Sequence, residues 1–246
     1  LQDDGYDVHA LHMTNWEDDE GYCTAAADLQ DARRVCEQLD IPLHHVNFSK
    51  QYRDQVFAYF LDEYRKGRTP NPDVLCNREI KFGVFRTYAR RLGGDLLATG
   101  HYARLREDAR GRAIWRGADP NKDQSYFLAL MTRGQVARAM FPVGELLKPA
   151  VRETAARFGL PTAEKKDSQG ICFIGEVKMS DFLAHYLAQD PGEIVDIEGR
   201  VLGRHKGLHF HTIGQRKGHG VASPREGMAY VVVAKDHATN RLVLGW

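Results

Sequence analysis

Two of the four cysteines stand in segments where a thiol could do chemistry. Cys76 lies in NPDVLCNREI, three residues after Asp73, and Cys172 lies between two glycines in GICFIG. We predict that Cys76 stands in a loop at the start of a helix, where unpaired N–H groups and the helix dipole stabilise a thiolate. Asp73 is near enough in sequence to act as a base or to orient the thiol. Structural thiols at both positions remain the alternative.

The other two cysteines favour a simpler interpretation. Cys36 falls on the apolar face of a predicted helix, so we expect it to be a small buried hydrophobe. Cys23, at the foot of that helix, is expected to be inert. Because the four cysteines form neither a C-x-x-C pair nor a dense disulfide framework, we expect a reducing, cytoplasmic location.

Metal binding is not expected. Cys76 and Cys172 are far apart in sequence and lack the closely spaced partners of zinc sites. His209 and His211, two residues apart, are only a weak indication of a metal site. We therefore predict no tightly bound metal.

The charge is balanced overall but unevenly distributed. The chain of 246 residues has 34 Lys and Arg against 33 Asp and Glu, so net charge does not indicate nucleic-acid binding. Residues 199–225, however, carry six Lys or Arg and four His with no acid. The stretch Arg200–Lys217 is either a solvated face or a surface that contacts phosphates. No apolar run approaches the roughly 20 residues that would cross a membrane.

Alternating strands and helices must position these residues. We predict strands over 5–14, 42–48 and 95–102, helices over 25–39, 51–64 and 77–92, a hairpin over 102–118, and helical segments near 125–131 and 149–158. This order predicts βαβ units on a parallel sheet. From residue 175 onward, a short helix over 180–187 and two hairpins predict a smaller, mostly β domain. We expect boundaries of 1–174 and 175–246.

Three segments are expected to converge on one crevice. Ligands of such sheets bind beyond the carboxyl ends of the strands, where we place residues 13–15, 71–77 and 99–101. Gly100, at a strand end, would let a flat ligand approach the backbone closely, although a plain turn explains it equally well.

Five segments, in order, resemble the tRNA-specific 2-thiouridylase family: NPDVLCNREIKF, ATGHYAR, NKDQSYFL, DSQGICFIG and HTIGQRKG. The resemblance spans nearly the whole chain. It implies an adenine-nucleotide-hydrolase-like domain of the PP-loop ATP pyrophosphatase type. It also implies an enzyme that replaces the C2 oxygen of wobble uridine 34 in tRNA with sulfur.

The resemblance also implies roles for the thiols and for the loop before Cys76. Cys172 would carry a persulfide, and Cys76 would help to release its terminal sulfur and become disulfide-linked to Cys172. Asp73 would serve as acid or base for the uracil, and Asn71, Pro72 and Asp73 would surround the flipped target base.

The family uses ATP, with Mg²⁺ expected, to adenylate the C2 oxygen so that AMP can leave. Met13 and Gly100 match nucleotide-contacting positions. The phosphate-binding S-G-G-x-D-S loop is expected just upstream of Leu1, and a C-terminal barrel after Trp246, so we expect the chain to be truncated at both ends.

His101, Lys122, Asp123 and Gln124 match positions that contact tRNA. A lysine at this place suits a phosphate or ribose, whereas an exposed turn is the alternative. Expected partners are tRNA and a sulfur-donor protein, either a cysteine desulfurase or a sulfur-relay protein, with no membrane and a monomeric enzyme. The rival functions are a non-catalytic tRNA-binding fragment and another adenylating ligase of the ATP-pyrophosphatase type. The ligase is disfavoured because its reaction needs no thiol pair.

Overall fold

A computed structural model describes residues 1–16, 25–166, 179–222 and 227–246. The chain divides into an N-terminal unit of residues 1–57 and 71–176 and a C-terminal unit of residues 58–70 and 177–246. The chain leaves the N-terminal unit inside one continuous helix, made of α2 (Ser49–Tyr52), η1 (Arg53–Phe57) and α3 (Ala58–Arg65), and returns to it at Asn71.

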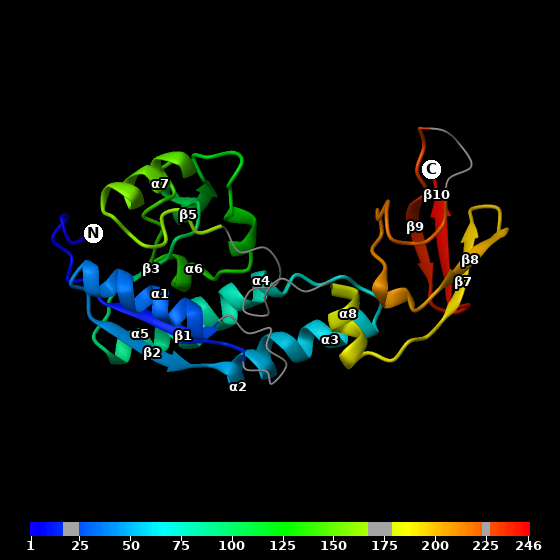
Figure 1. The fold of residues 1–246 in the computed structure, drawn as a ribbon, viewed down its shortest axis with the longest axis horizontal. Coiled ribbons are helices and arrows are strands. Elements are labelled where there is room, and N and C mark those ends of the chain that lie inside the picture. The colour runs from blue at the N-terminus through cyan, green and yellow to red at the C-terminus, as the bar shows by residue number, and fades with distance from the viewer. Residues whose placement is uncertain (17–24, 167–178, 223–226) are drawn as a thin grey trace. The chain divides into compact units, whose positions relative to one another are not determined.

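The N-terminal unit mixes helices with two pairs of parallel strands (Figure 1). Besides α2 and η1, its elements are β1 (Ala10–Thr14), α1 (Ala25–Gln38), β2 (Leu43–Asn47), α4 (Pro72–Leu75), η2 (Cys76–Phe85), α5 (Arg86–Arg91), β3 (Leu97–Ala98), β4 (Ala103–Asp108), β5 (Gly111–Arg116), η3 (Ser125–Leu128), α6 (Arg133–Val136), β6 (Ala139–Met140) and α7 (Lys148–Arg157). β1 pairs with β2 and β3 with β6, both in parallel, whereas β4 and β5 form an antiparallel hairpin. The predicted α/β class with parallel strands is confirmed.

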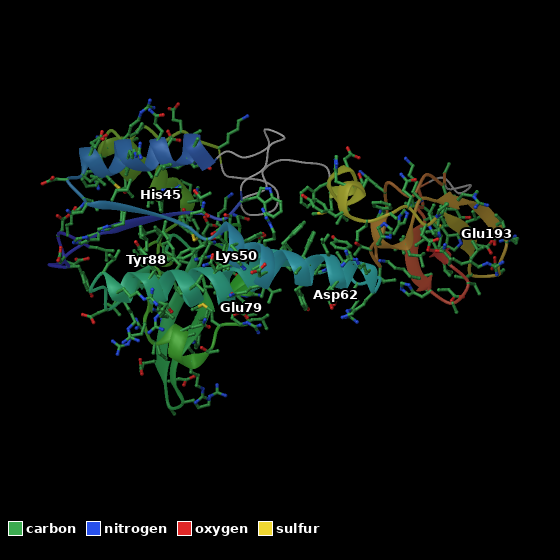
Figure 2. The ribbon with its side chains drawn as sticks, turned by 90° about the horizontal axis from the view of Figure 1, so that it is seen from below. His45, Lys50, Asp62, Glu79, Tyr88 and Glu193 are labelled. Atoms are coloured by element: carbon green, nitrogen blue, oxygen red, sulfur yellow. The ribbon has the colours of Figure 1, made fainter. Side chains whose placement is uncertain are left out.

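Helices cover both faces of the β1–β2 pair. Figure 2 shows α1 over the face where His45 is labelled, and the η2–α5 helix with Tyr88 along the opposite face. Buried aromatic rings fix the start of the α2–η1 helix: the Trp16 ring meets Phe57 edge-on at 4.8 Å and Tyr52 at 6.2 Å between centroids. Burial of such large rings is the main source of stability in this layer.

The helix that carries Cys76 begins earlier than predicted. The pattern predicted a start at Asn77, but α4, η2 and α5 run continuously from Pro72 to Arg91. The physical reason is an N-cap: the Asn71 side-chain oxygen accepts the N–H groups of Asp73 at 3.0 Å and Val74 at 3.4 Å. Pro72 at the first helical position loses nothing, because its N–H would be unpaired there anyway.

The predicted strands are longer than the observed ones. Residues 5–9 make no ladder, because the amino end folds back on itself and the Tyr6 N–H bonds to Leu1 O at 3.1 Å. The strand expected from Asp95 keeps only β3. By contrast, the helix near 149–158 is confirmed as α7, with Pro149 in its first turn and Gly159 (φ +65°) just after its end.

The C-terminal unit is mostly β, as predicted. Its elements are α3, α8 (Met179–Tyr186), β7 (Gly192–Asp196), β8 (Val201–His205), η4 (Leu208–Phe210), β9 (Val231–Asp236) and β10 (Arg241–Gly245). The sheet has the order β8-β7-β10-β9, with β7 and β10 parallel and the other pairs antiparallel. The turn between β9 and β10 spans four residues, 237–240, and not the two predicted. Its last residue, Asn240, has φ +53°.

The core of this unit lies on one face of the sheet. The buried side chains that pack together are Ile194, Leu208, Tyr230, Val232, Leu242 and Leu244. Outside the gaps at 17–24, 167–178 and 223–226, no helix combines the length and the apolar character that a membrane crossing requires.

Candidate functional site

The loop-to-helix junction at residues 71–77 is the centre of the predicted site. The N-cap described above fixes the backbone of Asn71, Pro72 and Asp73. Asp73 is half-buried, and the Cys76 side chain one helical turn later is fully buried. Residues three apart on a helix are neighbours, so Asp73 and Cys76 share one side of it.

Cys76 does not lie where we predicted, so the predicted cause of its thiolate stabilisation is wrong. We predicted Cys76 in a loop at the helix start, beside unpaired N–H groups. It lies instead in the second turn, and its own N–H is bonded to the carbonyls of Pro72 and Asp73. A π-helical stretch begins at Cys76, and such stretches are frequent at functional sites.

The segment after the β4–β5 hairpin packs directly on this junction. The Asn77 side chain is 2% exposed and donates to Phe127 O at 3.1 Å, which ties η2 to η3. Tyr126, beside Phe127, is 56% exposed. Burial raises the pKa of Tyr126, and the carboxylates of Asp73 and Asp123 raise it further, so all three side chains lie in one neighbourhood.

Asp123 and Gln124 hold the chain in place. Asp123 Oδ1 accepts the N–H groups of Gly117 at 2.9 Å and Ser125 at 3.2 Å. Burial acts to raise the pKa of Asp123, but these hydrogen bonds outweigh it and lower the pKa. The Gln124 side chain accepts the Tyr102 N–H at 3.1 Å, and the Gln124 N–H donates to Tyr102 O at 3.0 Å.

Lys122 is half-buried, with its backbone N–H on Asp119 O at 3.2 Å. The predicted tRNA contacts Lys122, Asp123 and Gln124 therefore form one compact turn. His101 reaches the same place because it immediately precedes Tyr102.

His101 is a buried imidazole. It is 8% exposed, its Nδ1 lies 2.8 Å from Thr99 Oγ1, and its ring contacts Phe82 and Phe141. Burial, followed by the charge of Lys81, lowers the pKa of His101 to about 3. A neutral ring can exchange a hydrogen bond with RNA but cannot act as a cation for a phosphate.

Met13 and Gly100 line one cavity of about 970 Å³ in the N-terminal unit. Its walls come from β1, β3 and the η2–α5 helix, and His101 and Gln124 lie at its edge. A Cβ added to Gly100 would meet no atom within 4 Å, and Gly100 has no positive φ. Packing within the described residues does not require a glycine at this position.

Asn15, just past the carboxyl end of β1, has a buried amide. It is 1% exposed, and neither Nδ2 nor Oδ1 has a hydrogen-bond partner in the part of the chain that the structure describes. A buried unsatisfied amide costs about 1–3 kcal/mol, so the residue calls for an explanation. We predicted that residues 13–15 face the crevice, but nothing in the sequence marked Asn15 over its neighbours.

The predictions for the other three cysteines can be compared with the structure in part. Cys172 and Cys23 lie outside the described residues. Cys36 is 7% exposed on α1, as predicted. Lys165, shortly before Cys172 in sequence, forms ion pairs with Asp28 at 2.7 Å and Asp31 at 2.6 Å, which attach this part of the chain to α1.

In the basic stretch, Arg200 is bound by the carboxylates of Asp196 and Glu198, each at 2.6 Å. Arg204, Lys206 and Lys217 are exposed. His211 is buried, and His209 is half-buried. Among the described residues, no group of three or more His, Cys, Asp or Glu could hold a metal ion.

Two residues that hold the site together were not foreseen. Asp119 is 5% exposed, and its Oδ2 accepts the Lys148 N–H at 2.9 Å at the start of α7. Gln135 donates to Arg78 O at 2.7 Å and Phe82 O at 3.0 Å, which fastens α6 to η2. Both partners are distant in sequence, so no local pattern could have indicated these bonds.

The chain was compared with known protein families and curated proteins. Residues 1–176 match the family described as "tRNA methyl transferase HUP domain", and residues 180–246 match "tRNA methyl transferase PRC-barrel domain". The proteins named "tRNA-specific 2-thiouridylase MnmA" include similar chains from three bacteria. The one from Akkermansia muciniphila is 59% identical over 249 residues, which is 100% of this chain and 70% of that protein.

The relative from Pseudomonas entomophila is 55% identical, covering 100% of this chain and 67% of its own length. The relative from Pasteurella multocida is 56% identical, covering 99% of this chain and 65% of its own length. The chain thus spans about two thirds of these relatives.

Proposed function

The chain belongs to the tRNA-specific 2-thiouridylase family, and we propose that the protein replaces the C2 oxygen of the wobble uridine 34 in tRNA with sulfur. One observation carries the proposal beyond the family. The N-P-D-V-L-C-N junction and the K-D-Q-S-Y-F turn, 50 residues apart in sequence, are joined by the Asn77–Phe127 hydrogen bond. Together they put a carboxylate, a thiol and an exposed aromatic ring in one place.

Activation of the uracil requires ATP as a co-substrate. The C2 oxygen is a poor leaving group, and its attack on the α-phosphate of ATP releases pyrophosphate and makes AMP the leaving group. We propose that Met13 and Gly100 contact the nucleotide from the cavity. The open space beside Gly100 supports this assignment, because the described packing has no other use for a glycine there. Mg²⁺ would accompany the phosphates, as with other nucleotides.

The sulfur step uses two thiols in the proposed mechanism. The Cys76 thiolate attacks the inner sulfur of a persulfide on Cys172, and the outer sulfur leaves as hydrosulfide. Hydrosulfide attacks C2 of the adenylated uracil and displaces AMP, while a Cys76–Cys172 disulfide remains. A cellular thiol reductant must then return two electrons before the next turnover.

Asp73 is the proposed acid or base for the uracil and its attacking sulfur. The Asn71 cap and Pro72 hold the Asp73 backbone at the start of the helix, one turn before Cys76. We further propose that the orphaned amide of Asn15 hydrogen-bonds the polar edge of a bound substrate, because its donor and acceptor are otherwise unused.

For tRNA binding, we propose that Lys122 contacts the backbone. Asp123 and Gln124 shape the turn that presents it, because their side chains are occupied by Gly117, Ser125 and Tyr102. His101 would exchange a neutral hydrogen bond. We propose that a cysteine desulfurase or a sulfur-relay protein loads Cys172. We further propose a monomeric, cytoplasmic enzyme with a domain boundary after residue 174.

Methyl transfer is the alternative that the family descriptions name. The whole-chain relatives are named for thiolation, and a paired thiol mechanism suits sulfur, so thiolation is the better supported reaction. The test is nucleoside analysis of tRNA from cells lacking the complete protein. We expect 2-thiouridine at position 34 to disappear and to return with the wild-type gene. Unchanged 2-thiouridine, or loss of a methylated nucleoside instead, would contradict the proposal.

A further inference from the structure

The β4–β5 hairpin has one packed and one open face. Paired residues of an antiparallel ladder share a face, so Arg104 lies beside Trp115, and Arg106 beside Ala113. On the opposite face, Ala103 is fully buried and Arg112 donates to Ala137 O at 3.3 Å, directly after α6, so this face lies against the body of the unit. The face that carries Trp115 is therefore the outer one.

Trp115 is unusually open for its size. It is 53% exposed, and among the described residues no aromatic ring stacks on it and no cation lies over it. Exposure of this much apolar ring is unfavourable in isolation. A flat, exposed indole beside arginines is the kind of platform on which nucleic-acid bases stack.

The charge of the hairpin favours an anionic partner. Residues 103–116 contain five arginines and only two acids, Glu107 and Asp108. Arg104 Nε donates to Arg116 O at 2.6 Å, so the guanidinium of Arg104 is bound to the strand that carries Trp115. Arg104 and Arg106 both contact Glu145, so two guanidinium groups share one carboxylate, and positive charge remains on the outer face.

The base of the hairpin is continuous with the predicted tRNA contacts. Gly117, directly after β5, donates to Asp123 at 2.9 Å, and Tyr102, directly before β4, exchanges two hydrogen bonds with Gln124. The Arg116 side chain is 88% exposed, with its Nε 4.0 Å from Asp123. The base of the hairpin and the turn that carries Lys122 are therefore joined directly, with Arg116 between them.

We propose that Arg104, Arg106 and Trp115, here called the hairpin patch, form a further tRNA-contacting surface. An unpaired base of the tRNA stacks on Trp115, and neighbouring phosphates pair with the arginines. The proposal rests on the proposed function, because it takes tRNA as the partner. Charge complementarity and continuity with Lys122 select RNA over an apolar protein surface.

The test measures the affinity of the complete protein for unmodified tRNA at several salt concentrations. Trp115→Ala should weaken binding by about 5- to 100-fold, the worth of one stacked base, and Trp115→Phe should restore most of it. Arg106→Gln should lower the slope of log affinity against log salt by about 0.7–0.9. Turnover at saturating tRNA should stay at the wild-type value in all three variants, because the patch contacts no reacting atom.

Matched controls come from exposed residues elsewhere. Tyr59, 47% exposed on α3, tests an aromatic ring outside the patch, and Arg90 on α5 tests an exposed arginine. Equal affinities for Trp115→Ala and Tyr59→Ala, or equal slopes for Arg106→Gln and Arg90→Gln, would overturn the proposal. So would unchanged tRNA affinity with weakened capture of the sulfur donor, which would make the patch a protein-binding surface.

These outcomes are separable from failure of the proposed function. If the wild-type protein neither binds nor thiolates tRNA, the function itself is wrong. If the wild type does both and the patch variants match it, only the hairpin patch is wrong. Trp115 and Arg106 are exposed, so thermal unfolding midpoints should not change, and a lowered midpoint with lost affinity in both Trp115 variants would assign the tryptophan a structural role.

Discussion

The two units of the protein bury unpaired polar atoms of different kinds. In the N-terminal unit, the side-chain atoms without a partner among the described residues are both polar atoms of Asn15, Oδ1 of Asn77, the Tyr102 hydroxyl and Nδ1 of His12, so most of them belong to amides. In the C-terminal unit, they are imidazole nitrogens of His205, His209 and His211. An unpaired amide can only form a hydrogen bond with a ligand, whereas an unpaired imidazole nitrogen can also be protonated.

The difference indicates how each unit uses a destabilising feature. Unsatisfied amides in the N-terminal unit suit a site that exchanges hydrogen bonds with a substrate, at a cost in stability that activity justifies. Burial lowers the pKa of three histidines in the C-terminal unit, His205, His209 and His211, against two in the N-terminal unit, His12 and His101, so we expect the C-terminal unit to be the more sensitive to acid. The predictions below test this division, beginning with the largest expected effect.

Loss of either proposed reactive thiol should abolish thiolation. Cys76→Ser or Cys172→Ser in the complete protein removes one sulfur of the relay, so no 2-thiouridine should form in single- or multiple-turnover assays. Cys36→Ser is the control, because Cys36 is also buried but lies on α1. It should lower only the thermal midpoint. Wild-type rates in the Cys76 variant would remove the relay from consideration.

Asp73→Asn should reduce turnover by roughly 10²–10⁴, the usual worth of one acid or base group. Asparagine keeps the shape, and the Asn71 cap uses the backbone N–H of Asp73, so the helix start should survive. Affinity for tRNA should change little. Collapse of affinity with intact single-turnover chemistry would make Asp73 a positioning residue.

Asn15→Leu separates a substrate contact from a structural role. Leucine is close in size and removes an unsatisfied amide, so the free energy of unfolding should stay equal or increase, while kcat/KM falls by roughly tenfold for one lost hydrogen bond. A lower free energy of unfolding with normal kcat/KM would mean that the amide binds structural water. Asn47→Leu is the contrasting control: Asn47 Oδ1 accepts the Ser49 N–H at 2.8 Å, so leucine there should lower the free energy of unfolding and leave kcat/KM unchanged.

Local signals predicted one unit better than the other. In the C-terminal unit, the β7–β8 and β9–β10 hairpins follow from alternating residues and nearby turns. In the N-terminal unit, the strand and helix types were predicted, but the strand ends were not. Neighbouring strands decide where a ladder stops, and the Asn71 cap moved a helix start by five residues.

The same limit applies to the site. The cavity joining Met13 to Gly100 was predictable as a crevice, because carboxyl ends of parallel strands meet, but residues 71–77, predicted to share it, are not among its lining residues. The bond from Gln135 to Arg78 O and the buried amide of Asn15 depend on tertiary packing, which no spacing rule encodes.

Acid should unfold the C-terminal unit first. Burial lowers the pKa of His211 to about 4, and burial also lowers the pKa values of His205 and His209. Above about pH 6.5 these rings are neutral in both states and the stability they allow is fully present. As pH falls from 6.5 toward 4, these histidines bind protons in the unfolded chain but stay neutral in the folded unit. The free energy of unfolding therefore decreases.

This acid effect is measured by amide hydrogen exchange at pH 7.5 and 4.5, comparing the protection of strands β7–β10 with that of η2. His211→Gln should reduce the acid sensitivity, and the exposed His185→Gln should leave it unchanged. Faster acid-induced exchange in η2 than in β7–β10 would contradict the division, because His101, with its pKa of about 3, would then dominate.

The smallest expected effect concerns the basic stretch of the C-terminal unit, where phosphate contact and simple solvation compete. Three exposed side chains form no ion pair with any described residue, so each is available to a phosphate: Arg204, Lys206 and Lys217. Arg200 is already held by Asp196 and Glu198.

If the stretch contacts tRNA, separate Gln substitutions of Arg204, Lys206 and Lys217 should each flatten the log–log salt dependence of affinity by about 0.7–0.9, because each contact releases condensed counterions. Arg200→Gln should change the slope least, because Arg200 has two carboxylates of its own, whereas Arg104 and Arg106 share the single carboxylate of Glu145. Sequence preference should not move in any variant, because phosphate contacts position the protein without reading bases. Three unchanged slopes, alongside a flattened slope for Arg106→Gln, would restrict phosphate contacts among these residues to the N-terminal unit and would leave the basic stretch as a solvated face.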